Sequence, residues 1–336
     1  MQRKSLLSLA GSVGGAAILV FGLFLFSLQD IIIKFFSDQY SVLQIVFIRG
    51  VVSMVAIALM IRLFWRGTPF LSSRPGIALA RGLFGFCSYL TYYLAVASMP
   101  LAEVVAIVFT MPLFVTAMSA LLLGEKVGMR RWSAVLIGFL GVVVILSPEG
   151  EFNTLAVTLA FVASITYATQ TTITRFLSSH DQPLTLAFNS ILVFTCASAV
   201  LSLLLLGGII SVTSEHASLA FFARDWAMPE PMHLALMIFL GVNGAVGFYC
   251  LSKAYCTAEA SAIAPFEYTY IIWAVVFGYL LWDEVPGVTT IIGIIILVLS
   301  SLYIWYRERQ LEQLPASEFE PQLDINYAEE KSGYQP

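Results

Sequence analysis

The segment "AYCTAEASAIAPFEYTYIIWAVVFGYLLWDE", residues 254–284, aligns without gaps with "AVASMPLAEVVAIVFTMPLFVTAMSALLLGE", residues 95–125. Both segments begin with a short polar break, contain a proline (Pro112 and Pro265) and end in a glutamate. Both are also apolar for most of their length. The match predicts that the chain contains two related halves, each with a membrane-buried helix at the corresponding place.

The composition is that of a membrane protein. Of the 336 residues, 59% are hydrophobic and only 11% are charged, and the mean hydropathy is +0.87. Soluble proteins carry about 25% charged residues, so this chain cannot cover itself with polar surface. The four cysteines lie in apolar runs without a C-x-x-C pair, which indicates neither a disulfide framework nor a zinc site. We predict no metal and no cofactor.

Apolar segments long enough to cross a bilayer recur along the chain, since a spanning helix needs about 20 mainly apolar residues. The first such run continues too far for a cleaved signal peptide and is interpreted as an uncleaved span. The predicted spans are 14–36, 42–65, 76–98, 101–123, 131–147, 153–176, 183–206, 232–255, 260–282 and 287–306.

The positions of lysine and arginine near the span ends predict the orientation, because these residues are enriched on the cytoplasmic side. With the N-terminus inside, only Lys34 and Arg224 fall outside. Both termini are therefore predicted to be cytoplasmic. The residues that fall inside are Arg3, Lys4, Arg62, Arg66, Arg74, Lys126, Arg130, Arg131, Arg175, Arg307 and Arg309.

The repeat and the orientation together predict the domain organisation. Residues 1–148 form a first half with five spans, and residues 149–306 form a second half with five more. Because five is odd, the second half enters the membrane from the opposite side, which gives an inverted repeat of the kind found in secondary transporters. Residues 307–336 are acidic and lack apolar periodicity, and we predict a disordered cytoplasmic tail.

This arrangement resembles the drug/metabolite transporter superfamily, specifically its ten-helix EamA-type members. The resemblance covers about residues 14–306 and is carried by the segment 80–146 and by "AIAPFEYTYIIWAVVFGYLLWDEVP". Within the superfamily the pattern resembles a branch with bacterial importers of riboflavin and S-adenosylmethionine. The resemblance implies a multi-pass protein of the bacterial inner membrane that moves a small metabolite.

Ionisable and polar side chains within the spans are the candidates for solute binding, because charges in a bilayer are costly and normally face a cavity or a partner. Aromatic side chains near them suit a flat, partly polar solute. The predicted substrate-binding residues are Asp30, Lys34, Arg49, Arg81, Tyr89, Tyr92, Gln170, Asn189, Asn243, Glu267, Tyr270 and Trp273.

Several of these charges have more than one interpretation. Asp30 and Lys34 are one helical turn apart, so they either neutralise each other or contact the solute. Arg49 either pairs with Asp30 or meets an anionic group of the solute. Arg81 lies near a span end, where it either extends to the lipid headgroups or lines the path. Glu267 either binds the solute or a proton, or makes a bond between helices.

Small residues and prolines within spans predict packing or hinge positions. Gly241, Gly244 and Gly247 allow two helices to approach closely or slide. Pro112 and Pro265 free backbone carbonyls and permit kinks.

The sequence predicts a secondary transporter that works by alternating access. There is no phosphate-binding G-x-x-x-x-G-K-[ST] motif and no H-E-x-x-H or G-x-S-x-G motif. The expected partners are a small solute and the lipid bilayer, with proton coupling and homodimer formation left open and no role for nucleic acid. Export of amino acids or drug-like compounds is one alternative. A membrane-embedded enzyme acting on a lipid-linked substrate is the alternative from another class.

Overall fold

The computed structural model describes residues 2–111, 113–114, 129–145, 153–177, 180–212, 216–257 and 264–312, and within these residues the chain is helical without strands. The elements are α1 (Gln2–Phe36), α2 (Val42–Phe64), α3 (Pro75–Val96), α4 (Leu101–Val108), α6 (Met129–Ile145), α7 (Thr154–Leu177), α8 (Pro183–Leu206), α9 (Ala217–Ala223), α10 (Pro231–Thr257), the 3-10 helix η1 (Ala264–Tyr268), α12 (Thr269–Trp282) and α13 (Val288–Glu312).

Every predicted span contains a helix in its described residues, and five helices are clearly long and apolar enough to cross a membrane. The fourth predicted span is described as α4 and a few following residues, while Pro112 lies outside the described residues. The ten crossings and the side on which the termini lie stay predictions. The five clear segments are Gly14–Phe36, Val42–Phe64, Thr154–Thr174, Pro183–Leu206 and Pro231–Leu251.

The outermost helices are longer than the apolar runs that predicted them. Helix α1 begins at Gln2 instead of residue 14, and α13 continues to Glu312 instead of ending at residue 306. The first six residues of the predicted tail, 307–312, thus continue α13, and the disorder of the tail stays a prediction. The polar sequence "RERQLE" consists of good helix formers, so the helix outlasts the hydrophobic stretch. Residues 313–336 lie outside the described residues.

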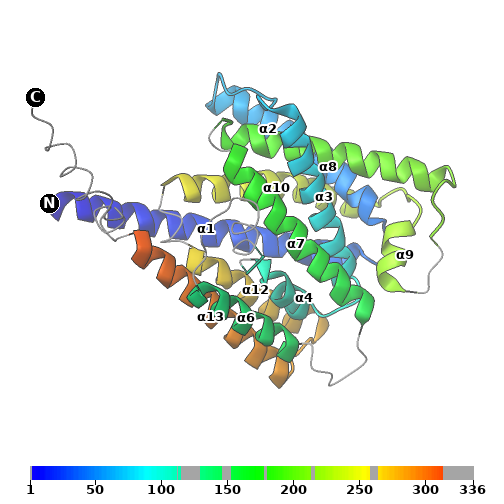
Figure 1. The fold of residues 1–336 in the computed structure, drawn as a ribbon. Coiled ribbons are helices and arrows are strands. Elements are labelled where there is room, and N and C mark those ends of the chain that lie inside the picture. The colour runs from blue at the N-terminus through cyan, green and yellow to red at the C-terminus, as the bar shows by residue number, and fades with distance from the viewer. Residues whose placement is uncertain are drawn as a thin grey trace, which may run out of the picture.

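The helices of one half pack mainly against helices of the other (Figure 1). Helix α1 packs on α10, and the matching contact is that of α7 with α3. Helix α2 packs on α10, and the matching contact is that of α8 with α3. Likewise, the contact of α1 with α12 matches that of α7 with α4. Three further contacts, α2–α8, α4–α12 and α6–α13, each join two corresponding helices. In chain order, α1, α2, α3, α4 and α6 correspond to α7, α8, α10, α12 and α13. When each helix is replaced by its counterpart in the other half, every one of these contacts becomes another contact of the set or remains the same. Two related halves are expected to give this pattern.

Asp181 joins two connections at one end of the bundle. It lies just before α8 and accepts hydrogen bonds from Ser72 Oγ, from Ser73 N at 3.0 Å and from Ser73 Oγ at 2.9 Å, so it ties the α2–α3 connection to the α7–α8 turn. Burial raises the pKa of Asp181, but the hydrogen bonds from Ser72 and Ser73 outweigh it and hold the pKa below its ordinary value. The ionised carboxylate is therefore the stabilising form.

The variant Asp181→Ala is expected to unfold at a lower temperature. Each hydrogen bond to a charged group contributes about 1.5–3 kcal/mol, and a 1 kcal/mol loss lowers the midpoint by about 2–4 °C. Because the folded pKa is depressed, the stabilisation is complete above the unfolded pKa of about 3.9 and is lost as pH falls through the folded pKa. Thermal unfolding of the detergent-solubilised protein at pH 7 measures this, with exposed Asp225→Ala as the control. Equal midpoints for the two variants would contradict it.

Candidate functional site

The centre of the candidate site is the carboxylate of Asp30 in α1, which is only 1% exposed. Tyr93 donates a hydrogen bond to its Oδ1 at 2.7 Å, and Tyr92 donates one to its Oδ2 at 2.7 Å. Tyr270, at the start of α12, also donates to Oδ2. Three phenol hydroxyls from two helices thus surround one buried acid. We call Asp30, Tyr92, Tyr93 and Tyr270 the tyrosine cage.

The spacing on α3 explains why two tyrosines reach the same acid. Tyr89, Tyr92 and Tyr93 stand at i, i+3 and i+4, which places them on one face of the helix. The rings of Tyr92 and Tyr93 lie 4.9 Å apart at a steep angle, so each hydroxyl approaches a different carboxylate oxygen. Phe109 packs against Tyr270 with ring centroids 6.2 Å apart and supports the third member. The cage is therefore held by aromatic packing as well as by its hydrogen bonds.

Arg49 in α2 is a buried cation that is linked to the tyrosine cage through Tyr89. It is 5% exposed, donates a hydrogen bond to the Tyr89 hydroxyl, and has its guanidinium carbon 4.4 Å from the centroid of the same ring. Tyr89 in turn packs on Tyr93 with ring centroids 4.4 Å apart. Arg49 and Asp30 attract each other electrostatically, but no ion pair joins them in the described part of the chain. Of the two interpretations of Arg49, pairing with Asp30 is thus replaced by a link through the rings of Tyr89 and Tyr93, and contact with the solute stays a prediction.

Gln29 and Tyr93 were not among the predicted site residues. Gln29 is 3% exposed and its Nε2 donates to the Tyr93 hydroxyl at 2.9 Å. A signal for Gln29 was available, because it occupies the place in "QDIIIKFFS" that the predicted residue Gln170 occupies in "QTTITRFLS". Tyr93 has the helical spacing that selected Tyr89.

Lys34 does not pair with Asp30, so the interpretation as a self-neutralising pair was wrong. Its Nζ forms an ion pair with Glu284 and donates to the Met99 carbonyl at 3.3 Å. It also lies 5.0 Å from the ring centroid of Trp282. The physical reason is competition, since the tyrosine hydroxyls occupy the Asp30 oxygens and Glu284 is presented from the connection after α12. Asp30 and Lys34 belong to two different clusters on one helix.

The local fold after α12 positions Glu284. Asp283 adopts a left-handed conformation with φ of 53°, which Asp tolerates better than most residues, and the backbone N–H of Glu284 donates to the Gly278 carbonyl at 3.1 Å. This turn directs the Glu284 carboxylate to α4, where Oε2 accepts a hydrogen bond from the Leu101 N–H at 3.0 Å. Glu284 therefore caps the first turn of α4 while it binds Lys34. We call Lys34, Glu284 and Leu101 the end clamp.

Glu267 stands three residues before Tyr270 of the tyrosine cage. It is half-buried in η1 and interacts electrostatically with Tyr167 of α7, which also interacts with Arg81 of α3. Arg81 is 8% exposed and donates to Thr174 Oγ1 at 2.6 Å, to the Leu186 carbonyl at 2.9 Å and to Ser190. Arg81 is buried between α3, α7 and α8, which overturns its interpretation as a residue extending to the headgroups.

Four other predicted binding residues contact helices elsewhere. Asn189 Nδ2 donates to the Phe70 and Thr185 carbonyls at 2.8 and 2.7 Å, and Asn243 Nδ2 donates to the Leu25 carbonyl at 2.7 Å. Gln170 is pressed against Gly85 of α3. Trp273 packs its ring against Phe24 with centroids 5.0 Å apart. Within the described part of the chain, no hydrogen bond joins these four to the tyrosine cage, and their contact with the solute stays a prediction.

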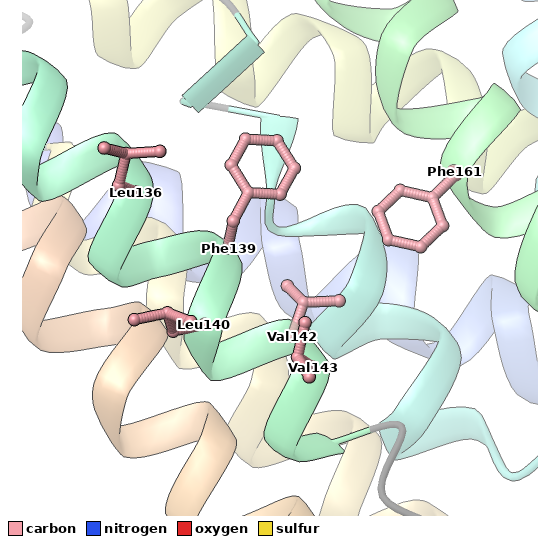
Figure 2. A pocket seen from close by; sticks show the side chains of 6 residues that line it. All are labelled: Leu136, Phe139, Leu140, Val142, Val143 and Phe161. Carbon is pink, nitrogen blue, oxygen red and sulfur yellow. The ribbon is translucent and has the colours of Figure 1, made fainter.

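Two apolar hollows lie away from the cage. One of about 370 Å³ is formed by α6 and by Phe161 of α7, and Figure 2 shows Phe139 and Phe161 facing each other across it. The other, of about 630 Å³, is formed by α1, η1 and α12 and includes Trp273. Exposed side chains such as Leu140 and Phe21 line them. In a bilayer such surfaces face lipid tails, so neither hollow is the candidate site.

The predicted packing positions differ from one another. An added Cβ would come within 2.5 Å of Val52 at Gly241 and within 3.1 Å of Phe26 at Gly247, so these glycines allow close helix contact. At Gly244 the nearest atoms are polar and lie 3.6 Å or farther away. Pro265 belongs to η1, and the regular helix begins only at Thr269, as a break near this proline requires. Its hinge role stays a prediction.

Comparisons with known proteins identify the family. Residues 13–147 and 154–306 each match the EamA-like transporter family. An S-adenosylmethionine uptake transporter of Rickettsia conorii is 28% identical over 287 residues, which cover 84% of this chain and 90% of that protein. A riboflavin transporter of Vibrio cholerae is 34% identical over 206 residues, covering 61% of this chain and 62% of that protein.

A solved crystal structure supports the fold. It superimposes with a TM-score of 0.60 at 16% identity, over 90% of this chain and 99% of the other, a likeness that concerns the fold alone. The two family matches extend over nearly all of the predicted spans, and the relatives named above are transporters rather than enzymes. The chain therefore belongs to the EamA-like transporter family and is a multi-pass membrane transporter.

Proposed function

We propose that this protein moves a small organic cation with an aromatic group, of the kind of S-adenosylmethionine, by alternating access. The observation that supports this best is the Asp30 carboxylate, buried within a membrane-spanning helix and surrounded by three tyrosine hydroxyls. A buried acid in a membrane helix is costly and usually marks a binding site or an ion pathway. Asp30 is therefore the solute-binding acid in this proposal.

The chemistry of the cage favours a positive charge with low hydration. Aromatic rings attract cations through their electron-rich faces, and a sulfonium or quaternary ammonium group loses little on leaving water compared with a small ion. The carboxylate adds a full opposite charge in a region of low dielectric, where electrostatic attraction is strong. The tyrosine rings also offer flat surfaces for an attached aromatic system. S-adenosylmethionine combines a sulfonium with an adenine ring.

Riboflavin is the second candidate, because the relative in Vibrio cholerae that bears this name is 34% identical where it aligns. Its flavin ring is flat and uncharged, so it would use the tyrosine rings and hydroxyls without needing the charge of Asp30. The two candidates therefore differ in what they require of a single residue. A substitution that removes only the charge of Asp30 separates them.

The two other clusters fit the ends of a solute path. The end clamp holds α1, α4 and the end of α12 together at the predicted outer end, and it is proposed to close the path there. Glu267, with Tyr167 and Arg81, lies towards the predicted cytoplasmic end. An acid at this place can take up and release a proton during the transport cycle. Proton coupling through Glu267 is therefore part of the proposal.

The experiment is solute uptake and release by the purified full-length protein in liposomes. Labelled S-adenosylmethionine and riboflavin are tested in both directions, with and without a pH gradient. We expect transport of S-adenosylmethionine, accelerated by the gradient. The variant Glu267→Gln is expected to transport at a rate that no longer depends on the gradient, because the amide cannot exchange a proton at this position.

The outcomes are distinct. Riboflavin transport without S-adenosylmethionine transport selects the second candidate, and transport of neither solute contradicts the proposed substrate class. A pH response that is unchanged in Glu267→Gln removes this residue from the coupling and leaves the substrate assignment intact. The variant Asp38→Asn, which changes an exposed acid after α1, controls for the loss of one negative charge.

A further inference from the structure

The missing Cβ of Gly244 in α10 leaves a methyl-sized gap whose three nearest atoms are polar. A Cβ placed on Gly244 would lie 3.6 Å from Gln29 Oε1, 3.7 Å from Ser53 Oγ and 4.0 Å from Arg49 Nη2. At Gly241 and Gly247, on the same helix, the same atom would meet apolar side chains at shorter distances. The three glycines therefore do not form one uniform packing surface.

Gln29 supplies an independent sign that this gap takes a ligand. The residue is 3% exposed, and its Oε1 has no hydrogen-bond partner among the described residues. An unpaired buried acceptor is costly, so a membrane protein seldom leaves one inside its bundle without use. The atom that lacks a donor is the one that lies beside Gly244.

The orientation of the Gln29 amide follows from the tyrosine cage. A tyrosine hydroxyl has a single hydrogen, and Tyr93 donates that hydrogen to Asp30. The Tyr93 oxygen can then only accept, so Gln29 must present Nε2 to it, at 2.9 Å. The carbonyl oxygen is thereby turned towards Gly244. The cage thus fixes an acceptor at the gap, while Arg49 provides a cation with several donors beside it.

An acceptor and a guanidinium next to each other match the two charges of an α-amino acid. The ammonium group needs acceptors, which Gln29 Oε1 and Ser53 Oγ offer, and the carboxylate pairs well with an arginine. Ser53 already donates its hydrogen to the Gly241 carbonyl at 2.7 Å, so its oxygen is left to accept. We propose that Gln29, Ser53, Arg49 and Gly244 form a subsite for the α-amino-acid head group of the solute, beside the cage that holds its cationic centre.

This inference rests on the proposed function and adds which end of the solute lies where. It also explains why glycine stands at position 244. A methyl group there would meet its neighbours at ordinary contact distances, so the helices would still pack, but the space needed by the ammonium group would be filled. The expected effect of Gly244→Ala is thus on recognition of the head group and not on folding.

The test compares binding of three probes to the full-length protein in nanodiscs. The probes are S-adenosylmethionine, its decarboxylated form, which keeps the sulfonium and lacks only the carboxylate, and methylthioadenosine, which lacks both the head group and the sulfonium charge. The wild type is expected to prefer the complete solute, and Gly244→Ala and Gln29→Met are each expected to reduce that preference at least about tenfold, the effect of one hydrogen bond to a charged group. Gly76→Ala adds the same methyl group where nothing lies within 4 Å and serves as the control.

A second measurement separates this inference from the proposed function. Thermal stabilisation by free α-amino acids is compared with stabilisation by the corresponding amines, which lack the carboxylate. Discrimination that disappears in Gly244→Ala supports the subsite even if S-adenosylmethionine is not transported, in which case only the proposed function fails. Transport of S-adenosylmethionine with equal preference in wild type and both variants overturns the subsite alone. Absence of both transport and discrimination overturns both.

Discussion

Transport of S-adenosylmethionine is expected to fall about 100-fold when Asp30 is replaced by asparagine. The side chain keeps its shape, but the carboxylate that attracts the cationic centre is lost. A charge-assisted interaction in a buried site contributes about 3 kcal/mol, which corresponds to about two factors of ten in affinity. The measurement is the initial rate of uptake into liposomes at a solute concentration below saturation.

A structural role for Asp30 would give a different pattern. If the residue only holds Tyr92, Tyr93 and Tyr270 together, the variant loses every solute equally. If it binds the cation, the variant loses transport of S-adenosylmethionine much more than transport of S-adenosylhomocysteine, which lacks the methyl group and therefore the positive sulfur. An equal loss for both probes would falsify the solute-binding role. Unchanged transport of S-adenosylmethionine would do so as well.

Breaking the end clamp is expected to open the predicted outer end of the path. In Lys34→Met and in Glu284→Gln the ion pair is lost, while the glutamine can still accept from the Leu101 N–H. The side chains of the pair are 10% and 19% exposed, so solvent screens the interaction only in part. We expect a cysteine introduced as Ala102→Cys, one residue beyond the clamp, to react about ten times faster with a membrane-impermeant thiol reagent added outside.

The double variant provides the internal check for the clamp. Once Lys34→Met has removed the pair, adding Glu284→Gln should change the reaction rate little, because the two substitutions remove the same interaction. Asp283→Asn, at the neighbouring left-handed position, should leave the rate unchanged, since asparagine tolerates this conformation. Additive effects of Lys34→Met and Glu284→Gln would show that the two residues do not act as a pair in the membrane.

The sequence predicted the helical segments well, because each is marked by an apolar run that also limits its position. The ends were less predictable: the polar residues after 306 continue α13, and hydropathy carries no signal for a helix that leaves the membrane. Asp30, Tyr92 and Tyr270 were predicted as separate candidates and are in contact. Helical spacing identifies which residues share a face, and it was sufficient for the tyrosines of α3.

The partners across helices could not be predicted in the same way. Lys34 and Glu284 are 250 positions apart, and one-turn spacing made Asp30 the more obvious partner of Lys34. Glu267 was a candidate because it is an acid within the apolar run 261–281, yet its place in the sequence does not tell which helix faces it. Asn189 and Asn243 were chosen for their polarity, and the structure uses that polarity to bond Phe70 and Leu25 carbonyls. Such choices depend on the packing of whole helices.

The exchange of contacts between the two halves has a consequence for how the protein is made. When α6 has entered the membrane, α1 and α3 still lack α10 and α7, their main neighbours, because these helices have not yet been synthesised. The first half therefore waits in the bilayer with Asp30 held by only two of its three hydroxyls, since Tyr270 arrives with α12. Insertion and assembly are thus separate stages for this chain, as they are for helical membrane proteins in general. A chain truncated after α6 would present unmatched polar groups to lipid and would be a natural target for the proteases that clear unassembled membrane proteins.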